Sequence, residues 1–289
     1  MKWLRAIKER WIDVLNKYNR ILYIPLCVFV CIFCFAVIGS GDFKTHNVNS
    51  NVTLSNKKIG WGIRRNDNNE QPDLGAENKQ LIEKYNGISI GNVQSKNVYL
   101  TFDAGYEAGY TEKILEVLKQ NDVKATFFLT AHYINTEPEL VQKMIDEGHT
   151  IGNHTVNHKS MPDIDNETIK QEVMNLHTAV YEKFGYEMKY LRPPKGEYSE
   201  RTLAYTNTLG YKTVMWSFAY DDWDENKQGR EEYGKQKILN NIHNGAVILL
   251  HSTSKDNANI LDESIKEIKN MGYEFKSIEE FEQLEKTAQ

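Results

Sequence analysis

An aspartate directly follows a strand-like run near residue 100, so its side chain is expected to project beyond the end of the strand. Residues 101–107 read TFDAGYE and place Asp103 ahead of a glycine turn. A barrel enzyme presents catalytic carboxylates at this end of its strands, so Asp103 is a candidate general base that takes a proton from water. An isolated aspartate at such a place is more often a turn or helix-cap residue.

Two histidines four residues apart follow another strand-like run and are preceded by Gly152 and Asn153. His154 and His158 can direct two imidazole nitrogens at one divalent metal such as Zn²⁺. In isolation the spacing is more often found on a helix surface. Such a metal would polarise an acetyl carbonyl and lower the pKa of water toward about 7.

An arginine and a third histidine complete the set of groups that hydrolysis of an amide requires. Arg192, in the run RPPKG, has a planar guanidinium suited to orienting Asp103 and keeping it ionised, although a structural ion pair is an equal alternative. His251 ends the apolar run 247–250 and is a candidate general acid for the departing amine. Its plainer interpretation is a cap on a buried strand.

Together with Asp222-Trp223, these motifs occur in an order that resembles the polysaccharide deacetylases of the carbohydrate esterase group. The resemblance implies a distorted (β/α) barrel of about seven strands and a hydrolase that removes acetyl groups from sugars. It also implies that the backbone N–H of Lys195 contributes to an oxyanion hole. Tyr106 and Trp223 adjoin the motifs and are the aromatic residues expected to stack on a sugar.

Two positions depart from the pattern of that family. Members typically read TFDDG, with the second aspartate as third metal ligand, whereas this chain has Ala104. The chain therefore has a two-histidine metal site completed by water or by Asp103, or is a metal-independent hydrolase, or is an inactive relative that only binds glycan. The second departure is Ala219, where relatives carry an aspartate that tunes the histidine acid. Asp222 matches the later Asp-Trp of the motif, so the tuning of His251 stays open.

Both departures, with Trp61-Gly62, Gln71-Pro-Asp73 and residues 254–258, resemble one subgroup, the peptidoglycan N-acetylmuramic acid deacetylases of spore-forming bacteria. The likeness implies peptidoglycan as the partner and a role in forming the muramic δ-lactam of spore cortex. Deacetylation of N-acetylglucosamine in peptidoglycan or chitin is the alternative. Arg64-Arg65 and Lys195 are the candidate cations for the lactyl carboxylate of muramic acid.

Strand-like and helix-like runs alternate after residue 97, which predicts βαβ units and a parallel sheet. The expected strands cover residues 98–102, 125–129, 150–152, 190–191, 213–217, 246–250 and 273–275. The expected helices cover residues 112–120, 167–183, 201–209, 232–241 and 261–269. The polar motifs follow strands directly, where a barrel builds its site.

The N-terminal part has a different composition. Residues 1–20 contain six basic and two acidic side chains, so they carry +4 and the rest of the chain −9, which argues against binding to nucleic acid. Residues 21–39 form an uncharged run interrupted by Pro25 and predict a single membrane anchor, with a cleaved secretory signal as the alternative. The basic flank places the N-terminus in the cytoplasm and the enzyme domain outside the cell membrane.

A polar stretch at residues 40–60 predicts a linker, and residues 61–289 form the expected deacetylase domain. All three cysteines lie within residues 27–34. The domain therefore contains no cysteine, which excludes disulfides and thiolate metal sites there.

Overall fold

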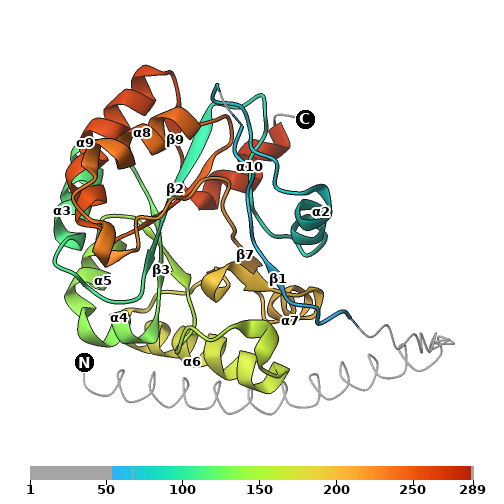
Figure 1. Cartoon of the computed structure of the whole chain (residues 1–289). Helices are drawn as coiled ribbons and strands as arrows, with labels where there is room; N and C mark the ends of the chain where they lie inside the picture. Colours follow the sequence, from blue (N-terminus) through green and yellow to red (C-terminus); the bar gives the residue numbers. More distant parts are fainter. Residues whose placement is uncertain (1–53, 67, 288–289) are drawn as a thin grey trace, which may run out of the picture. The chain divides into compact units, whose positions relative to one another are not determined.

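A parallel sheet forms the centre of the computed structural model, which describes residues 54–66 and 68–287. Figure 1 shows the strands of this sheet within a ring of helices. The seven strands are β2 (Asn97–Ala104), β3 (Thr126–Leu129), β4 (Thr150–Asn153), β5 (Tyr190–Leu191), β7 (Lys212–Thr213), β8 (Val247–His251) and β9 (Glu274–Phe275).

The strand order is β7-β5-β4-β3-β2-β8, and β9 pairs with the start of β2. Every pairing within this sheet is parallel, as βαβ units require. The predicted α/β class and seven-stranded parallel sheet are therefore confirmed. The sheet is a curled half-barrel, because β7 and β8 form its two ends and only a single bridge, between Phe218 and Ile248, links β8 to the segment after β7.

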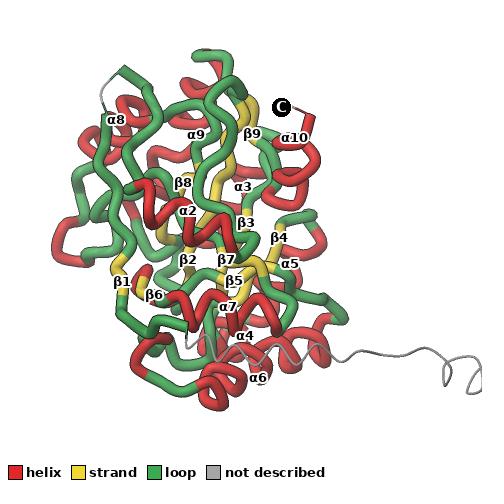
Figure 2. The backbone as a smooth tube through the Cα atoms, turned by 90° about the vertical axis from the view of Figure 1, so that its right-hand side faces the viewer, coloured by secondary structure: helices red, strands yellow, loops and turns green. Residues whose placement is uncertain are grey.

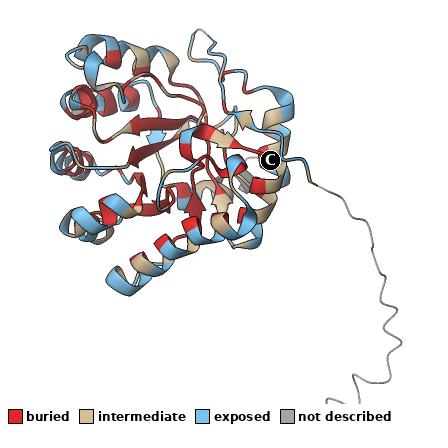
Figure 3. Ribbon diagram, turned by 60° about the horizontal axis from the view of Figure 1, so that its bottom comes forward, coloured by how far each residue is buried: buried red, intermediate tan, exposed pale blue. Residues whose placement is uncertain are grey.

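Helices surround the strands, which lie in the middle of the domain (Figure 2). The helices are α2 (Ala76–Lys84), α3 (Thr111–Gln120), α4 (Ala131–Thr136), α5 (Pro138–Asp146), α6 (Asn166–Phe184), α7 (Glu200–Thr208), α8 (Glu231–Asn241), α9 (Lys255–Asn270) and α10 (Phe281–Thr287). Figure 3 shows buried strands and helices with one buried and one exposed face. This burial pattern is expected of amphipathic helices packed on a sheet.

Side-chain alternation along β2 separates the packed core from the site. Phe102 and Ala104 are fully buried in the main apolar cluster between sheet and helices. Asp103 points to the opposite face, into the interior of the curl, as the period of two in a strand requires. The strand thus anchors itself with one face and presents a carboxylate with the other.

Local capping signals decide where the helices begin and end. The N-cap of α6 is Asp165, which accepts a hydrogen bond from the backbone of Thr168, and the helix ends at Gly185 with φ of 64°. Ser199 and Thr202 form a reciprocal capping box at the start of α7.

Two predicted boundaries are wrong. The expected strand at residues 213–217 is only Lys212–Thr213. Val214 makes the last backbone hydrogen bond to β5, and Met215 bonds to Ile88 instead. The predicted linker also extends too far, since β1 (Ile59–Gly60) pairs antiparallel with β6 (Glu197–Tyr198). That pairing uses backbone groups, so the polar composition of residues 54–60 did not reveal it.

The predicted membrane anchor, the basic segment and most of the linker lie outside the described residues. In the described part of the chain, no helix has the length and apolar character needed to cross a bilayer.

Candidate active site

Strand register brings the predicted site residues together at the C-terminal edge of the sheet. Asp103 and His251 are direct partners in the β2–β8 pairing. His154 follows β4 by one residue and Arg192 follows β5 by one residue, and these two strands pair with each other. A cavity of about 1020 Å³ opens at this edge and is lined by, among others, Asp103, Tyr106, His154, His158, Lys195, Trp223 and His251.

A buried ion pair holds Asp103 in its charged form. Nη1 of Arg192 donates to Oδ1 of Asp103 at 2.8 Å, and the arginine side chain is fully buried. Burial alone raises the pKa of Asp103, but the charge of Arg192, followed by that of His154, outweighs burial and lowers the pKa below its ordinary value. Asp103 is therefore ionised at neutral pH and able to accept a proton.

Arg192 contacts Asp103 through one of its two terminal nitrogens. Its second terminal nitrogen, Nη2, donates to Oγ1 of Thr101 at 2.9 Å, and Nε donates to the Val214 carbonyl at 3.1 Å. The ring of Phe128 lies 4.2 Å from the guanidinium carbon. Several partners thus fix the position of the Arg192 guanidinium, which donates one hydrogen bond to Asp103.

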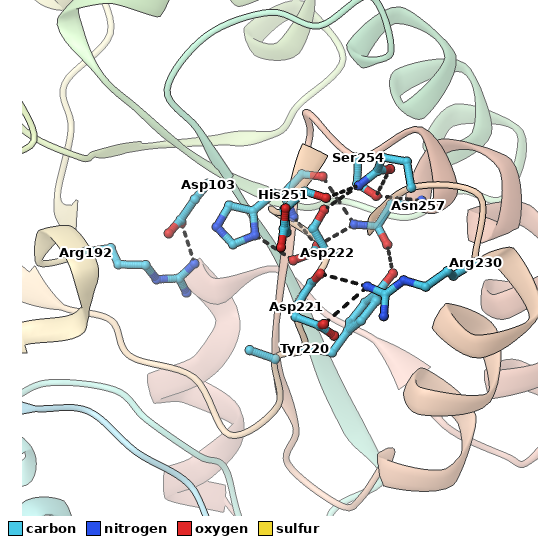
Figure 4. Close-up of polar contacts among 12 residues, drawn as sticks. Asp103, Arg192, Tyr220, Asp221, Asp222, Arg230, His251, Ser254 and Asn257 are labelled. Atoms are coloured by element: carbon cyan, nitrogen blue, oxygen red, sulfur yellow. Dashed lines mark hydrogen bonds and ion pairs between the residues drawn. The ribbon is translucent and has the colours of Figure 1, made fainter. Parts of the chain in front are cut away.

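Asp222 supplies the partner of His251 that Ala219 cannot provide. Its carboxylate Oδ1 lies 2.8 Å from Nδ1 of His251, and Oδ2 accepts the backbone N–H of His251 at 2.7 Å (Figure 4). A carboxylate only accepts, so Nδ1 carries the proton and Nε2 is the nitrogen free to act in the cavity. Burial lowers the pKa of His251, but the charge of Asp222 and this hydrogen bond outweigh burial and raise it above its ordinary value.

His154 and His158 lie edge to face with ring centroids 4.8 Å apart. Nδ1 of His154 is 2.9 Å from the Arg192 carbonyl, which only accepts, so Nδ1 is protonated and Nε2 keeps its lone pair. Burial lowers the pKa of both rings, that of His158 to about 4, so both are neutral at pH 7. Neutral imidazoles at one cavity wall fit a divalent metal.

The third ligand expected of a complete metal site is missing from this constellation. In the described residues, no group of three histidine, cysteine, aspartate or glutamate side chains has the geometry to hold a metal. Oδ2 of Asp103 lies 3.5 Å from Nε2 of His154, while Oδ1 is engaged by Arg192. Ala104 does not line the cavity, because its methyl group is buried in the core.

Three residues in or next to the cavity wall have a backbone conformation that is unusual for their residue types. Thr155, His158 and Lys195 have φ of 68°, 54° and 61°, in the left-handed region that side chains other than glycine seldom adopt. At Gly196, with φ of 65°, an added Cβ would lie 2.7 Å from the Trp216 ring. Strain at a polar cavity wall is typical of functional loops.

Tyr106 and Trp223, predicted to contact sugar, both line the cavity and are 40% and 60% exposed. Aromatic faces at a cavity mouth suit stacking on a pyranose ring. Sequence reasoning missed Thr101, Tyr220 and Asn257, which bond to Arg192 or support Asp222. Asn257 lies in the run of residues 254–258, but its distance from Asp222 along the sequence does not predict their contact.

Comparison with known proteins agrees with this geometry. Residues 90–214 match the family model of the polysaccharide deacetylases. The peptidoglycan-N-acetylmuramic acid deacetylase PdaA of Bacillus subtilis is 44% identical over 250 residues, 86% of this chain and 93% of that protein. The chain belongs to the polysaccharide deacetylase family.

A solved structure and one further relative extend this comparison. The solved structure of Bacillus subtilis PdaA, described as a family 4 carbohydrate esterase, superposes with a TM-score of 0.77 at 43% identity and covers 79% of this chain and 98% of its own. A peptidoglycan-N-acetylglucosamine deacetylase of Bacillus cereus is 33% identical and covers 67% of this chain and 71% of its own. The predicted family and a hydrolase of carbon–nitrogen bonds are thereby confirmed.

Proposed function

We propose that this deacetylase hydrolyses the acetamide of N-acetylmuramic acid in peptidoglycan, releasing acetate and a free amine. One observation carries the proposal: an ionised carboxylate, Asp103, and a histidine held as an N–H donor, His251, are register partners on one cavity wall. The 44% identity to PdaA supports muramic acid as the sugar. Formation of the muramic δ-lactam of spore cortex is the role that this substrate suggests.

Asp103 acts as the general base of the proposed reaction. It takes a proton from water as the water oxygen bonds to the acetyl carbonyl carbon, and the carbonyl becomes an oxyanion. The backbone N–H of Lys195, at the cavity wall, is the donor proposed for that oxyanion. Arg192 keeps Asp103 charged until the proton is transferred.

His251 acts as the general acid. Its Nε2–H gives a proton to the sugar nitrogen, the carbon–nitrogen bond breaks, and acetate and amine leave. Asp222 stabilises the charged imidazolium before that transfer and holds the ring with Nδ1 protonated.

His154 and His158 are the residues proposed to hold a divalent metal, with Zn²⁺ the ion that two imidazoles favour. When bound, such an ion supplies Lewis acidity to the acetyl carbonyl and to water. With two protein ligands instead of three, binding is expected to be weaker than at a complete site.

Lys195 is the cation proposed to meet the lactyl carboxylate of muramic acid. It lines the cavity, whereas Arg64 lies 3.9 Å from Asp73 and Arg65 donates to the Ala219 carbonyl. Neither arginine lines the cavity. Because a flexible ammonium can reach a carboxylate from several directions, Lys195 suits a substituent that rotates.

The decisive experiment compares three substrates with the purified protein: peptide-stripped glycan strands, intact peptidoglycan and chitin oligomers. Products are resolved by mass, and Asp103→Asn serves as the inactive control. We expect acetate from muramic acid of stripped strands, with loss of turnover after chelation and recovery on adding Zn²⁺. Release from chitin with muramic acid untouched would instead support the glucosamine alternative, and release from neither would support an inactive glycan-binding protein.

Membrane anchoring through residues 21–39, with the enzyme domain outside the cell, stays a proposal based on hydropathy and flanking charge. It agrees with a peptidoglycan substrate, which lies outside the membrane.

A further inference from the structure

Asn257 fastens the carboxylate that orients His251. Its side chain is fully buried in the first turn of α9, and its Nδ2 donates to Oδ2 of Asp222 at 2.6 Å and to the His251 carbonyl at 3.3 Å. Figure 4 shows this amide directed at Asp222 from the side opposite Asp103. Because a carboxylate and a carbonyl only accept hydrogen bonds, the amide nitrogen must face them, which fixes the amide orientation.

Tyr220 holds the other end of this amide. Its hydroxyl donates to Oδ1 of Asn257, and the tyrosine is 8% exposed. Burial, followed by the charge of Asp222, keeps the pKa of Tyr220 well above its ordinary value, so the hydroxyl stays a donor. Directed hydrogen bonds thus run from Tyr220 through Asn257 to Asp222, which also accepts from His251.

We propose that Asn257 and Tyr220 are positioning residues that lock Asp222 and so keep His251 as the Nδ1–H tautomer with Nε2 aimed at the cavity. Among the described residues, the Asp222 carboxylate accepts three hydrogen bonds. They come from the amide of Asn257 and from the backbone N–H and Nδ1–H of His251. Without the amide, Oδ2 keeps one donor and the carboxylate gains freedom to rotate. This inference rests on the proposed general-acid role of His251.

The same contacts would also be expected if Asn257 merely joined the β8 end to α9. Ser254 separates the two explanations, because its Oγ accepts the backbone N–H of Asn257 at 3.2 Å and caps α9 without contacting Asp222. Ser254→Ala is therefore a matched control that weakens the helix start and leaves the carboxylate contacts in place.

The variants to compare are Tyr220→Phe, which is nearly isosteric, and Asn257→Leu, which removes the amide. Each is expected to lower kcat for the acetamide substrate about tenfold and to leave KM unchanged. The loss is smaller than the rate enhancement of about 10²- to 10⁴-fold that general acid catalysis supplies, because His251 itself is still present. An activated aryl acetate needs no acid because its phenolate leaves unprotonated. Both variants should therefore hydrolyse it within about twofold of the parent rate.

Nitrogen-15 chemical shifts of the His251 ring provide a readout independent of turnover. At a pH above the pKa of His251, where the ring is neutral, we expect one Nδ1–H tautomer in the parent and in Ser254→Ala, and a tautomer mixture in Tyr220→Phe and Asn257→Leu. The proposal is overturned if the tautomer is unchanged in both variants. It is also overturned if kcat falls equally on the acetamide and the aryl acetate, in proportion to the fall in melting temperature. If Asn257→Leu does not fold, Tyr220→Phe decides alone. If the parent releases no acetate from any amide, the proposed function fails, while the ring shifts still test the positioning.

Discussion

At the residue scale, each candidate acid or base lies beside a partner that sets its charge. Arg192 keeps Asp103 ionised, and Asp222 keeps His251 able to donate. The two pairs meet at one cavity, although Asp103 and Asp222 are 119 residues apart in the numbering. A carboxyl group with a lowered pKa and a histidine with a raised pKa in one cavity are typical of acid–base catalysis.

Removing either group should abolish most of the turnover without unfolding the chain. Asp103→Asn leaves an amide that cannot take a proton, and His251→Ala leaves no acid, so each should lower kcat by about 10² to 10⁴. Acetate release and circular dichroism melting curves measure both effects. Asp146→Asn, an exposed aspartate on α5, is the control and should match the parent. Parent-like turnover in either site variant contradicts its assigned role.

Asp222→Asn should move the alkaline limb of the pH–kcat profile to lower pH. His251 must be protonated to act as the acid, so activity is present below its pKa and is lost as pH rises through it. Asp222 raises that pKa above the ordinary value, and the neutral amide removes the charge responsible. Initial rates across the neutral range measure the limb. A limb that stays in place or moves to higher pH shows that Asp222 does not tune His251.

At the element scale, β2 and the loop of residues 194–196 contribute different residues to the site. The strand carries Asp103 on one face and packs Phe102 and Ala104 with the other. The loop leaves β5 through two prolines and places Lys195 in the left-handed region. Strain in this loop is tolerated because the packed sheet stabilises the domain.

Ala104→Asp should destabilise the protein instead of restoring a metal ligand. The family pattern, in which an aspartate at this position is the third metal ligand, would favour tighter metal binding. The structure, however, buries the Ala104 methyl group in the core, where an unpaired carboxyl group costs about 2 kcal/mol or more. Urea unfolding gives the stability and calorimetry gives the Zn²⁺ affinity. Tighter Zn²⁺ binding at unchanged stability would show that the end of β2 turns residue 104 toward His154.

Lys195→Gly should change stability and activity in opposite directions. Glycine adopts φ of 61° without the penalty of a side chain, so the free energy of unfolding should rise by up to about 1 kcal/mol. KM for muramic substrates should rise because the ammonium is lost, whereas KM for chitin oligomers should not. Lys189→Gly is a suitable contrast, since Lys189 does not line the cavity. A parallel rise of KM on both substrates would remove Lys195 from lactyl recognition.

At the scale of the whole molecule, residues from Thr53 onward form one compact unit that contains the sheet, the helices and the cavity. No cysteine occurs in it, so no disulfide contributes to its stability. The acidic charge outside residues 1–20 makes close approach to an anionic glycan dependent on local cations such as Lys195.

A chain that starts at Thr53 should separate membrane binding from enzyme function. We expect it to stay in solution when phospholipid vesicles are sedimented, and to melt at the temperature of the parent with the same kcat on soluble glycan. The full chain should sediment with the vesicles, because an apolar run of this length partitions into a bilayer. A full chain that stays in solution would contradict the anchor.

Much of this architecture was predictable from local pattern. Apolar runs located β2, β3, β4 and β8 because these strands are buried within the sheet, and the motif residues follow strand ends directly. Short or polar elements were not predictable. The short helices α4 and α10 and the pairing of β1 with β6 depend on contacts with distant segments, which leave little local signal.

The sequence by itself determined the family, the parallel α/β class and the candidate acid–base residues, because these depend on residue types next to strand ends. Only the tertiary structure decided which hydrogen-bonding or ion-pair partner each of these residues has. Of the neighbouring aspartates, Asp221 turns toward Arg230 at 3.3 Å and Asp222 toward His251 at 2.8 Å. Such choices depend on strand register and on burial from distant elements, including Asn257 on α9, and no local spacing encodes them.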